Sequence, residues 1–136
     1  MMKSEIRVKI TCPQDIVMAR QQGRSLASQL GFAGSDLTII ATAISEVARN
    51  IVEHAGKGGI ILQSVEENPR RGLIIIAHDE GPGIPDIARA LQDGYSTGKG
   101  LGLGLPGTKR LMDEFEIVSE VGKGTTISMK KWTHRD

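Results

Sequence analysis

The spacing of hydrophobic and polar positions changes several times along the chain, and each spacing predicts a type of element. Residues 5–11 (EIRVKIT) alternate between apolar and polar, which is typical of a half-buried strand. From Pro13 onward, apolar residues recur every three or four positions as far as Gly31. This pattern predicts a helix that begins at the proline and ends at the glycine.

A second run of apolar positions with the helical period extends to about His54, and Ser35 or Asp36 can cap the start of this helix. Beyond it, residues 59–66 and 72–79 are predicted to be strands joined by the polar loop EENPRR. The second strand contains the continuous apolar run LIIIA, which is typical of strands buried on both faces.

The remaining third of the chain combines glycine-rich turns with short periodic segments. A Gly-Pro-Gly turn precedes a short helix opening at Pro85 and a long glycine-rich loop. A helix is predicted from about Leu105 to Glu114, and a closing hairpin is predicted from 115–120 and 124–131. We therefore expect an α+β fold, a two-layer sandwich of a mixed β-sheet with helices on one face.

Composition narrows the class of protein. The 136 residues, of which 39% are hydrophobic, suit one domain spanning 1–136. A net charge of +1 and an aromatic content of 3% give no electrostatic or stacking case for nucleic acid or an anionic membrane. No apolar run is long enough to span a bilayer, and the first ten residues lack the apolar stretch of a signal peptide. The lone Cys12 cannot form an internal disulfide, which favours a cytoplasmic location.

The predicted helix at 35–54 carries the first candidate chemistry. On a helical wheel Glu46, Asn50 and Glu53 lie opposite the apolar stripe, and Glu46 and Asn50 stack one turn apart. The amide oxygen of Asn50 is a ligand that suits Mg²⁺, and Glu46 could take a proton from a hydroxyl or water. The alternative is that these residues form only the solvated face of an amphipathic helix.

Asp79 ends the apolar strand and enters the turn EGPGI, where Gly81 and Gly83 would let the backbone pass close to a ligand. The alternative is an ordinary surface turn, because turns favour this composition. Similarly, GKGTT at 122–126 would by itself be only a hairpin turn.

The loop GYSTGKGLGLGLPG at 94–107 is a candidate phosphate-binding segment, because closely spaced glycines can turn several backbone N–H groups toward an anion. It is not a dinucleotide fingerprint, since it follows a polar stretch and not a strand, and it is not a Walker A motif, since Gly98-Lys99 lacks the following Ser or Thr. A flexible solvent loop is the alternative. The candidate residues are Lys99, Gly100, Leu101, Gly102, Leu103 and Gly104.

Taken together, the segments SEVARN (45–50), HDEGPGI (78–84), STGKGLGLGLPG (96–107) and VGKGTT (121–126) resemble the four nucleotide-binding boxes of the Bergerat-fold (GHKL) ATPases and kinases. The resemblance implies an ATP-binding enzyme that uses Mg²⁺. It further implies that Asp79 accepts a hydrogen bond from the adenine amine and that the hydroxyl of Thr125 helps to hold the adenine region.

Within that superfamily, the short chain is similar to the small serine kinases of bacterial partner-switching modules, including those of the stressosome. This implies transfer of the ATP γ-phosphoryl group to serine or threonine on a STAS-domain partner, with a PP2C-type phosphatase as a further partner. An anti-sigma factor kinase is the alternative within the fold, and an inert nucleotide-dependent binding module is the alternative outside it. Sigma-factor binding distinguishes the first two, and transfer from labelled ATP excludes the third.

Overall fold

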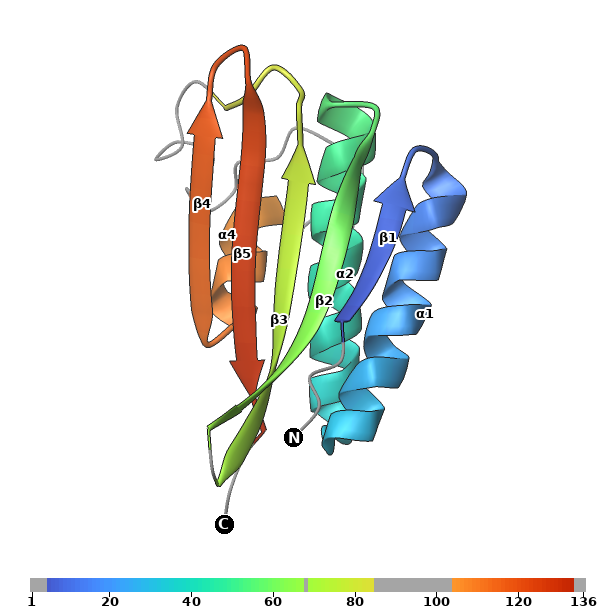
Figure 1. The fold of residues 1–136 in the computed structure, drawn as a ribbon, viewed down its shortest axis with the longest axis vertical. Helices are drawn as coiled ribbons and strands as arrows, with labels where there is room; N and C mark the ends of the chain where they lie inside the picture. The colour runs from blue at the N-terminus through green and yellow to red at the C-terminus, as the bar shows by residue number, and fades with distance from the viewer. Residues whose placement is uncertain (1–4, 68, 85–103, 134–136) are drawn as a thin grey trace.

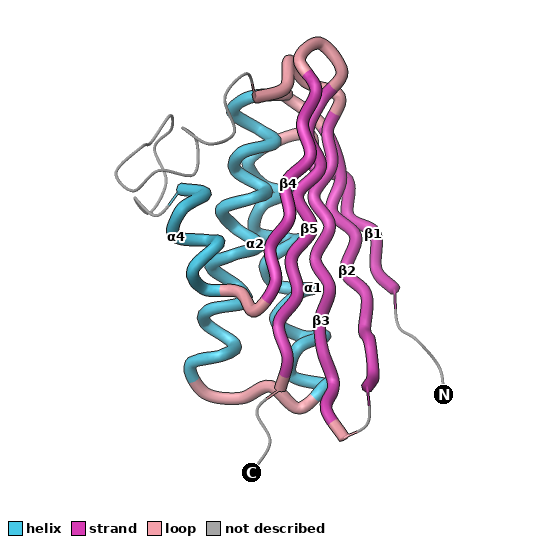
Figure 2. Tube along the Cα trace, turned by 90° about the vertical axis from the view of Figure 1, so that its left-hand side faces the viewer, coloured by secondary structure: helices cyan, strands magenta, loops and turns pink. Residues whose placement is uncertain are grey.

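The computed structural model describes residues 5–67, 69–84 and 104–133, which form a sheet with helices packed against it (Figure 1). The elements in chain order are β1 (Glu5–Ile10), α1 (Pro13–Leu30), α2 (Ser35–His54), β2 (Gly58–Glu67), β3 (Arg70–Asp79), α4 (Gly104–Leu111), β4 (Glu114–Glu120) and β5 (Gly124–Trp132). Seen along the sheet, the three helices lie on one face (Figure 2). The predicted α+β sandwich is therefore confirmed. The helix expected to open at Pro85 lies outside the described residues.

The sheet has the strand order β1-β2-β3-β5-β4, and every neighbouring pair is antiparallel. The expectation of a mixed sheet is wrong for the strands that the structure describes. Between β1 and β2 the chain runs through two successive helices, α1 and α2, which lie side by side (Figure 1). Two helices bring the chain back to the end of the sheet that it left, so β2 runs opposite to β1. A parallel pair would require a single crossover.

The ends of α1 match the sequence prediction, whereas the start of α2 does not. Pro13 begins α1, and Gly31 ends it with a φ of 103°, a value that glycine adopts readily. The residue before α2 is Gly34 with a φ of 61°, and no side chain caps the helix. The prediction of a Ser35 or Asp36 cap is therefore wrong. Gly34, whose positive φ suits glycine, occupies the position before the helix, where a capping side chain would have to stand.

The last helix is shorter than the sequence suggests, because α4 ends at Leu111 and not at Glu114. The N–H of Asp113 donates to the carbonyl of Lys130 at 3.0 Å, and its carboxylate accepts from the N–H of Trp132 at 2.7 Å. Asp113 therefore forms hydrogen bonds with β5 and does not continue the helix. The buried Lys131 donates through Nζ to the carbonyl of Leu111 at 3.3 Å and closes the end of the helix.

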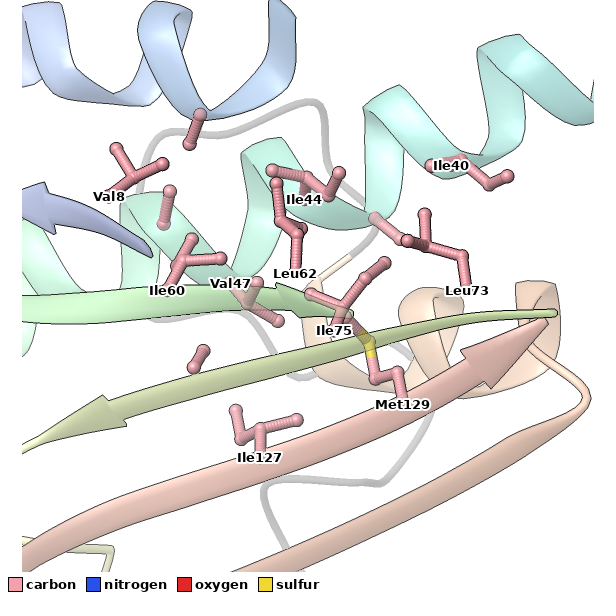
Figure 3. Close-up of a cluster of buried hydrophobic side chains, with 14 of the residues drawn as sticks. Val8, Ile40, Ile44, Val47, Ile60, Leu62, Leu73, Ile75, Ile127 and Met129 are labelled. Carbon is pink, nitrogen blue, oxygen red and sulfur yellow. The ribbon is translucent and has the colours of Figure 1, made fainter. Parts of the chain in front are cut away.

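The hydrophobic core lies between the sheet and the helices, where side chains from β1, β2, β3, β5 and α2 interlock (Figure 3). Gly23 of α1 is part of this packing, since a Cβ at this position would overlap the side chain of Ile44 on α2. On β3, Leu73 and Ile75 are fully buried, but Ile74 and Ile76 on the opposite face are only half-buried. The predicted burial of this strand on both faces is therefore wrong within the single chain.

Candidate nucleotide-binding site

The second half of α2 presents the two residues that the sequence singled out for catalysis and metal binding. Glu46 is only 7% exposed, Asn50 is half-buried, and Glu53 is exposed. The three residues therefore do not form one solvated face, and the amphipathic-helix alternative fails for Glu46. Charged side chains are seldom this deeply buried without a partner or a function. Glu46 and Asn50, one turn apart, can present a carboxylate and an amide to the same ligand.

Asp79 stands at the end of β3, where it pairs with Gly58 of β2 on one side and Thr125 of β5 on the other. Its Oδ1 accepts a hydrogen bond from the N–H of Gly81 at 2.8 Å, which fixes the orientation of the carboxylate. No hydrogen bond to Oδ2 comes from the residues that the structure describes. A half-buried acceptor in this position can take a hydrogen bond from a ligand amine.

The glycines after Asp79 are required by close contacts as well as by backbone angle. A Cβ on Gly81 would lie 2.6 Å from the Cβ of Ala55, the residue that ends α2. Gly83 has a φ of 81°, and a Cβ there would lie 2.5 Å from the carbonyl oxygen of Glu120. Segment 79–84 therefore runs between the end of α2 and the β4–β5 turn, with no room for side chains at these two positions.

Hydrogen bonds attach this segment to the β4–β5 hairpin. The Oγ of Ser119 accepts from the N–H of Ile84 at 2.7 Å, and the N–H of Gly122 donates to the carbonyl of Pro82 at 2.9 Å. The hydroxyls of Ser119 and Thr125 are 2.8 Å apart and share a hydrogen bond. Thr125, which is 7% exposed, is thus held beside Asp79 by a network. The sequence analysis missed Ser119, although the hairpin register places it opposite Thr125.

Arg49 is a second residue that the sequence analysis did not single out. Its Nε atom is buried and has no hydrogen-bond partner among the residues that the structure describes, and the residue adjoins Asn50 one turn after Glu46. A buried donor without a partner is unfavourable, and a guanidinium group binds phosphate or carboxylate oxygens well. The motif SEVARN could have pointed to Arg49, because this cation stands between Glu46 and Asn50, the two candidate residues of the helix.

The structure leaves part of the predicted site untested. Lys99, Gly100, Leu101, Gly102 and Leu103 lie outside the described residues, whereas Gly104 is the first residue of α4. Within the described ranges no cluster of three or more His, Cys, Asp or Glu side chains could hold a metal ion. The amide oxygen of Asn50 could serve as one protein ligand of a metal, beside oxygens supplied by a nucleotide. This arrangement suits Mg²⁺.

Comparisons with known proteins agree with the geometry. The family model described as "Histidine kinase-like ATPase domain" matches residues 12–131. The chain is 53% identical over 131 residues to the serine/threonine-protein kinase RsbT of Bacillus subtilis, an alignment that covers 96% of this chain and 98% of that protein. It is 34% identical over 128 residues to an anti-sigma F factor of Clostridium kluyveri, covering 90% of this chain and 89% of the relative.

Solved structures show the same fold at lower identity. The RsbU and RsbW domains of Rv1364c from Mycobacterium tuberculosis superpose with a TM-score of 0.60 at 23% identity, covering 96% of this chain and 32% of that one. The catalytic domain of the histidine kinase ThkA superposes with a TM-score of 0.52 at 14% identity, covering 96% of this chain and 95% of that one. At these identities the likeness concerns the fold alone.

The chain therefore belongs to the histidine kinase-like ATPase domain family, and within it this ATP-binding chain is a serine/threonine-protein kinase. Among the helices that the structure describes, none combines the length and the apolar character needed to cross a bilayer.

Proposed function

We propose that the chain transfers the γ-phosphoryl group of ATP to a serine or threonine of a STAS-domain protein in a bacterial stressosome partner switch. The observation that carries the proposal is the buried Glu46, 7% exposed, one turn before Asn50 on α2. The similarity to RsbT, at 53% identity over nearly the full length of both proteins, supports the choice of acceptor class. We also propose a cytoplasmic location and a PP2C-type phosphatase as a second partner.

In the proposed reaction Glu46 is the catalytic base. The acceptor hydroxyl oxygen forms a bond to the γ-phosphorus, and the bond from that phosphorus to the β,γ-bridging oxygen breaks. ADP leaves with the electron pair of the broken bond. The hydroxyl proton passes to the carboxylate of Glu46, which is largely shielded from water and can be aimed at one acceptor.

The remaining site residues are proposed to hold the nucleotide. Asp79, whose Oδ1 is fixed by Gly81, offers Oδ2 to the adenine amine, and Thr125 lies beside it. Gly81 and Gly83 keep the edge of the pocket free of side chains. Asn50 would hold Mg²⁺, which neutralises phosphate charge when it is bound. The segment containing Lys99 and Gly100–Gly104 is proposed to contact the phosphates.

A second candidate function is sequestration of a sigma factor, which the 34% identity to an anti-sigma F factor supports. The nucleotide-site residues described above are compatible with either function, so the nucleotide site does not separate the two. Direct binding of sigma factors to the purified chain would favour the second function. Phosphoryl transfer to a STAS protein without sigma binding would favour the first.

The test is transfer from labelled ATP to purified STAS-domain proteins, followed by mapping of the phosphorylated residue. A pull-down from the source cell with ATP present would identify the natural acceptor. Asn50→Ala should weaken Mg-ATP binding and abolish transfer while the protein remains folded. Undiminished transfer by a folded Asn50→Ala variant would refute the metal assignment. Nucleotide binding without transfer to any STAS protein, even by the wild type, would favour the inert binding module.

A further inference from the structure

Arg49 stands on the side of α2 that faces away from the sheet. It follows Ile40 by about two and a half helical turns, so the two residues lie on opposite sides of the helix. Ile40 is fully buried in the core, whereas Arg49 is half-buried. An arginine on an outer helix face is usually solvated. Arg49 differs, because its Nε atom is buried and donates no hydrogen bond to the residues that the structure describes.

The acidic neighbours of Arg49 on the helix do not pair with it. Glu46 stands about one turn before it and Glu53 about one turn after it, which is the spacing at which opposite charges can pair. Within the described ranges, however, neither carboxylate forms an ion pair with Arg49. Only the Nε atom of this guanidinium is buried without a partner, so the two terminal nitrogens remain accessible. As far as the described residues are concerned, Arg49 can therefore bind an anion.

The order of residues around α2 indicates which anion this is. Because a helix turns by about 100° per residue, Asn50 lies about 40° to one side of Glu46, and Arg49 lies about 60° to the other side. The proposed metal ligand and the arginine therefore flank the proposed base. An acceptor hydroxyl at Glu46 would have Mg-ATP on the Asn50 side, and the neighbouring residues of the acceptor protein would lie toward Arg49.

We propose that Arg49 binds a carboxylate of the acceptor protein, on an Asp or Glu side chain next to the serine or threonine that is phosphorylated. This role rests on the proposed function, since it requires a protein acceptor. The phosphates of ATP repel a carboxylate that comes close to them, and a guanidinium offsets that repulsion while its terminal nitrogens donate two parallel hydrogen bonds. Arg49 is thus a specificity-determining residue for the acceptor, and it does not touch the reacting atoms.

Steady-state kinetics with a purified STAS-domain protein as acceptor tests this role. Arg49→Gln removes the charge and should raise KM for the acceptor at least about tenfold, a change of about 1.4 kcal/mol. The kcat at saturating acceptor and the affinity for Mg-ATP should stay within about twofold of the wild-type values. Arg49→Lys keeps the charge without the planar fork and should recover only part of the loss.

A charge swap identifies the partner group on the acceptor. The acidic residues nearest to the mapped phosphorylation site are changed to arginine one at a time. One of these acceptor variants should show a raised KM with the wild-type kinase and a lower KM with Arg49→Glu, because the attractive pair is then restored with its charges exchanged. If Arg49→Glu restored the KM of none of them, the proposed role would be wrong.

The control is Arg71→Gln, which removes an exposed arginine at the end of β3 farthest from Asp79 and should change none of these quantities. Circular dichroism should show that the Arg49 variants are folded. An unchanged KM in folded Arg49→Gln would overturn the proposed role. So would a loss of kcat or of Mg-ATP affinity at unchanged KM, which would assign Arg49 to the phosphates. In both cases the wild type still phosphorylates the STAS protein, and the proposed function stands. A wild type that transfers to no STAS protein would overturn the proposed function and this role with it.

Discussion

The two faces of β3 carry similar residues in different surroundings. On β3, Leu73 and Ile75 point toward the helices and are fully buried, whereas Ile74 and Ile76 point to the other side and are half-buried. The difference comes from the helix layer, which covers only one face (Figure 2). Apolar character in a strand therefore shows that a surface is suited to burial, but the layer that buries it has to come from elsewhere in the chain or from another molecule.

The covered side also carries the chemistry. Glu46 and Asn50 belong to α2 of the helix layer, and Asp79 and Thr125 stand side by side where β3 and β5 meet the turns. The open face, which points away from the helices, presents charged residues at its edges but none of the proposed site residues that the structure describes. Changes on the covered side should therefore alter catalysis or folding, whereas changes on the open face should affect both much less. The following predictions test this division.

The largest effect is expected from Glu46→Gln, which keeps the side-chain volume and removes the base. Transfer to a STAS protein should fall by about 10²–10⁴-fold, while the affinities for Mg-ATP and for the acceptor protein stay nearly unchanged. Single-turnover phosphorylation and binding titrations measure these quantities side by side. Glu53→Gln makes the same chemical change at an exposed position of the same helix and should have no effect. Loss of ATP binding in Glu46→Gln would move this residue to the nucleotide site.

A comparison of Ile75→Ala with Ile76→Ala measures the difference between the two faces directly. Ile75 is fully buried against the helix layer, and its truncation should reduce the free energy of unfolding by about 2–5 kcal/mol. Ile76 is half-buried on the open face, so its truncation should cost less than about 1.5 kcal/mol in the monomer. Urea unfolding at low protein concentration is the measurement. Equal losses would show that the open face is as well packed as the covered one.

Asp79→Ala should reduce ATP affinity at least about tenfold and abolish the preference for ATP over GTP, since an unpaired polar group in the base pocket costs about 1–3 kcal/mol. Titration of both nucleotides against the wild type and the variant measures this. Glu80→Ala removes the neighbouring exposed carboxylate and serves as the control. If the wild type bound ATP and GTP equally well, the adenine role of Asp79 would have no basis.

The smallest effect is expected at the start of α1, away from the candidate nucleotide-binding site. The Oδ2 of Asp15 accepts hydrogen bonds from the N–H and the hydroxyl of Thr11 at 2.8 and 3.0 Å, and these bonds lower the pKa of its carboxyl from its ordinary value. A carboxyl with a depressed folded-state pKa stabilises the fold above its unfolded-state pKa, and this contribution is lost as the pH falls through the folded-state value. The urea midpoint of Asp15→Ala should therefore lie below that of the wild type at pH 7, and the gap should narrow below about pH 4. A gap that stays constant to pH 3 would contradict the prediction.

Local patterns predicted the elements well where a single segment decides the outcome. The period of α1 and its Pro13 and Gly31 boundaries, and the hairpin that contains Thr125, could all be derived from short windows. Predictions failed where distant residues compete for the backbone. Glu114 joined β4 because Asp113 and Trp132 form hydrogen bonds across the strands, and no window around residue 114 contains Trp132.

The sequence by itself determined the spacing of Glu46 and Asn50, the carboxylate that ends an apolar strand, and the glycines that follow it. These are properties of short segments, because helical and strand periods fix which neighbours share a face. Only the tertiary structure decided that Glu46 is buried, that Ser119 supports Thr125 and segment 79–84, and that one face of β3 remains open. Burial and hydrogen-bond partners depend on contacts between residues far apart in the chain, and the order and direction of the strands set those contacts.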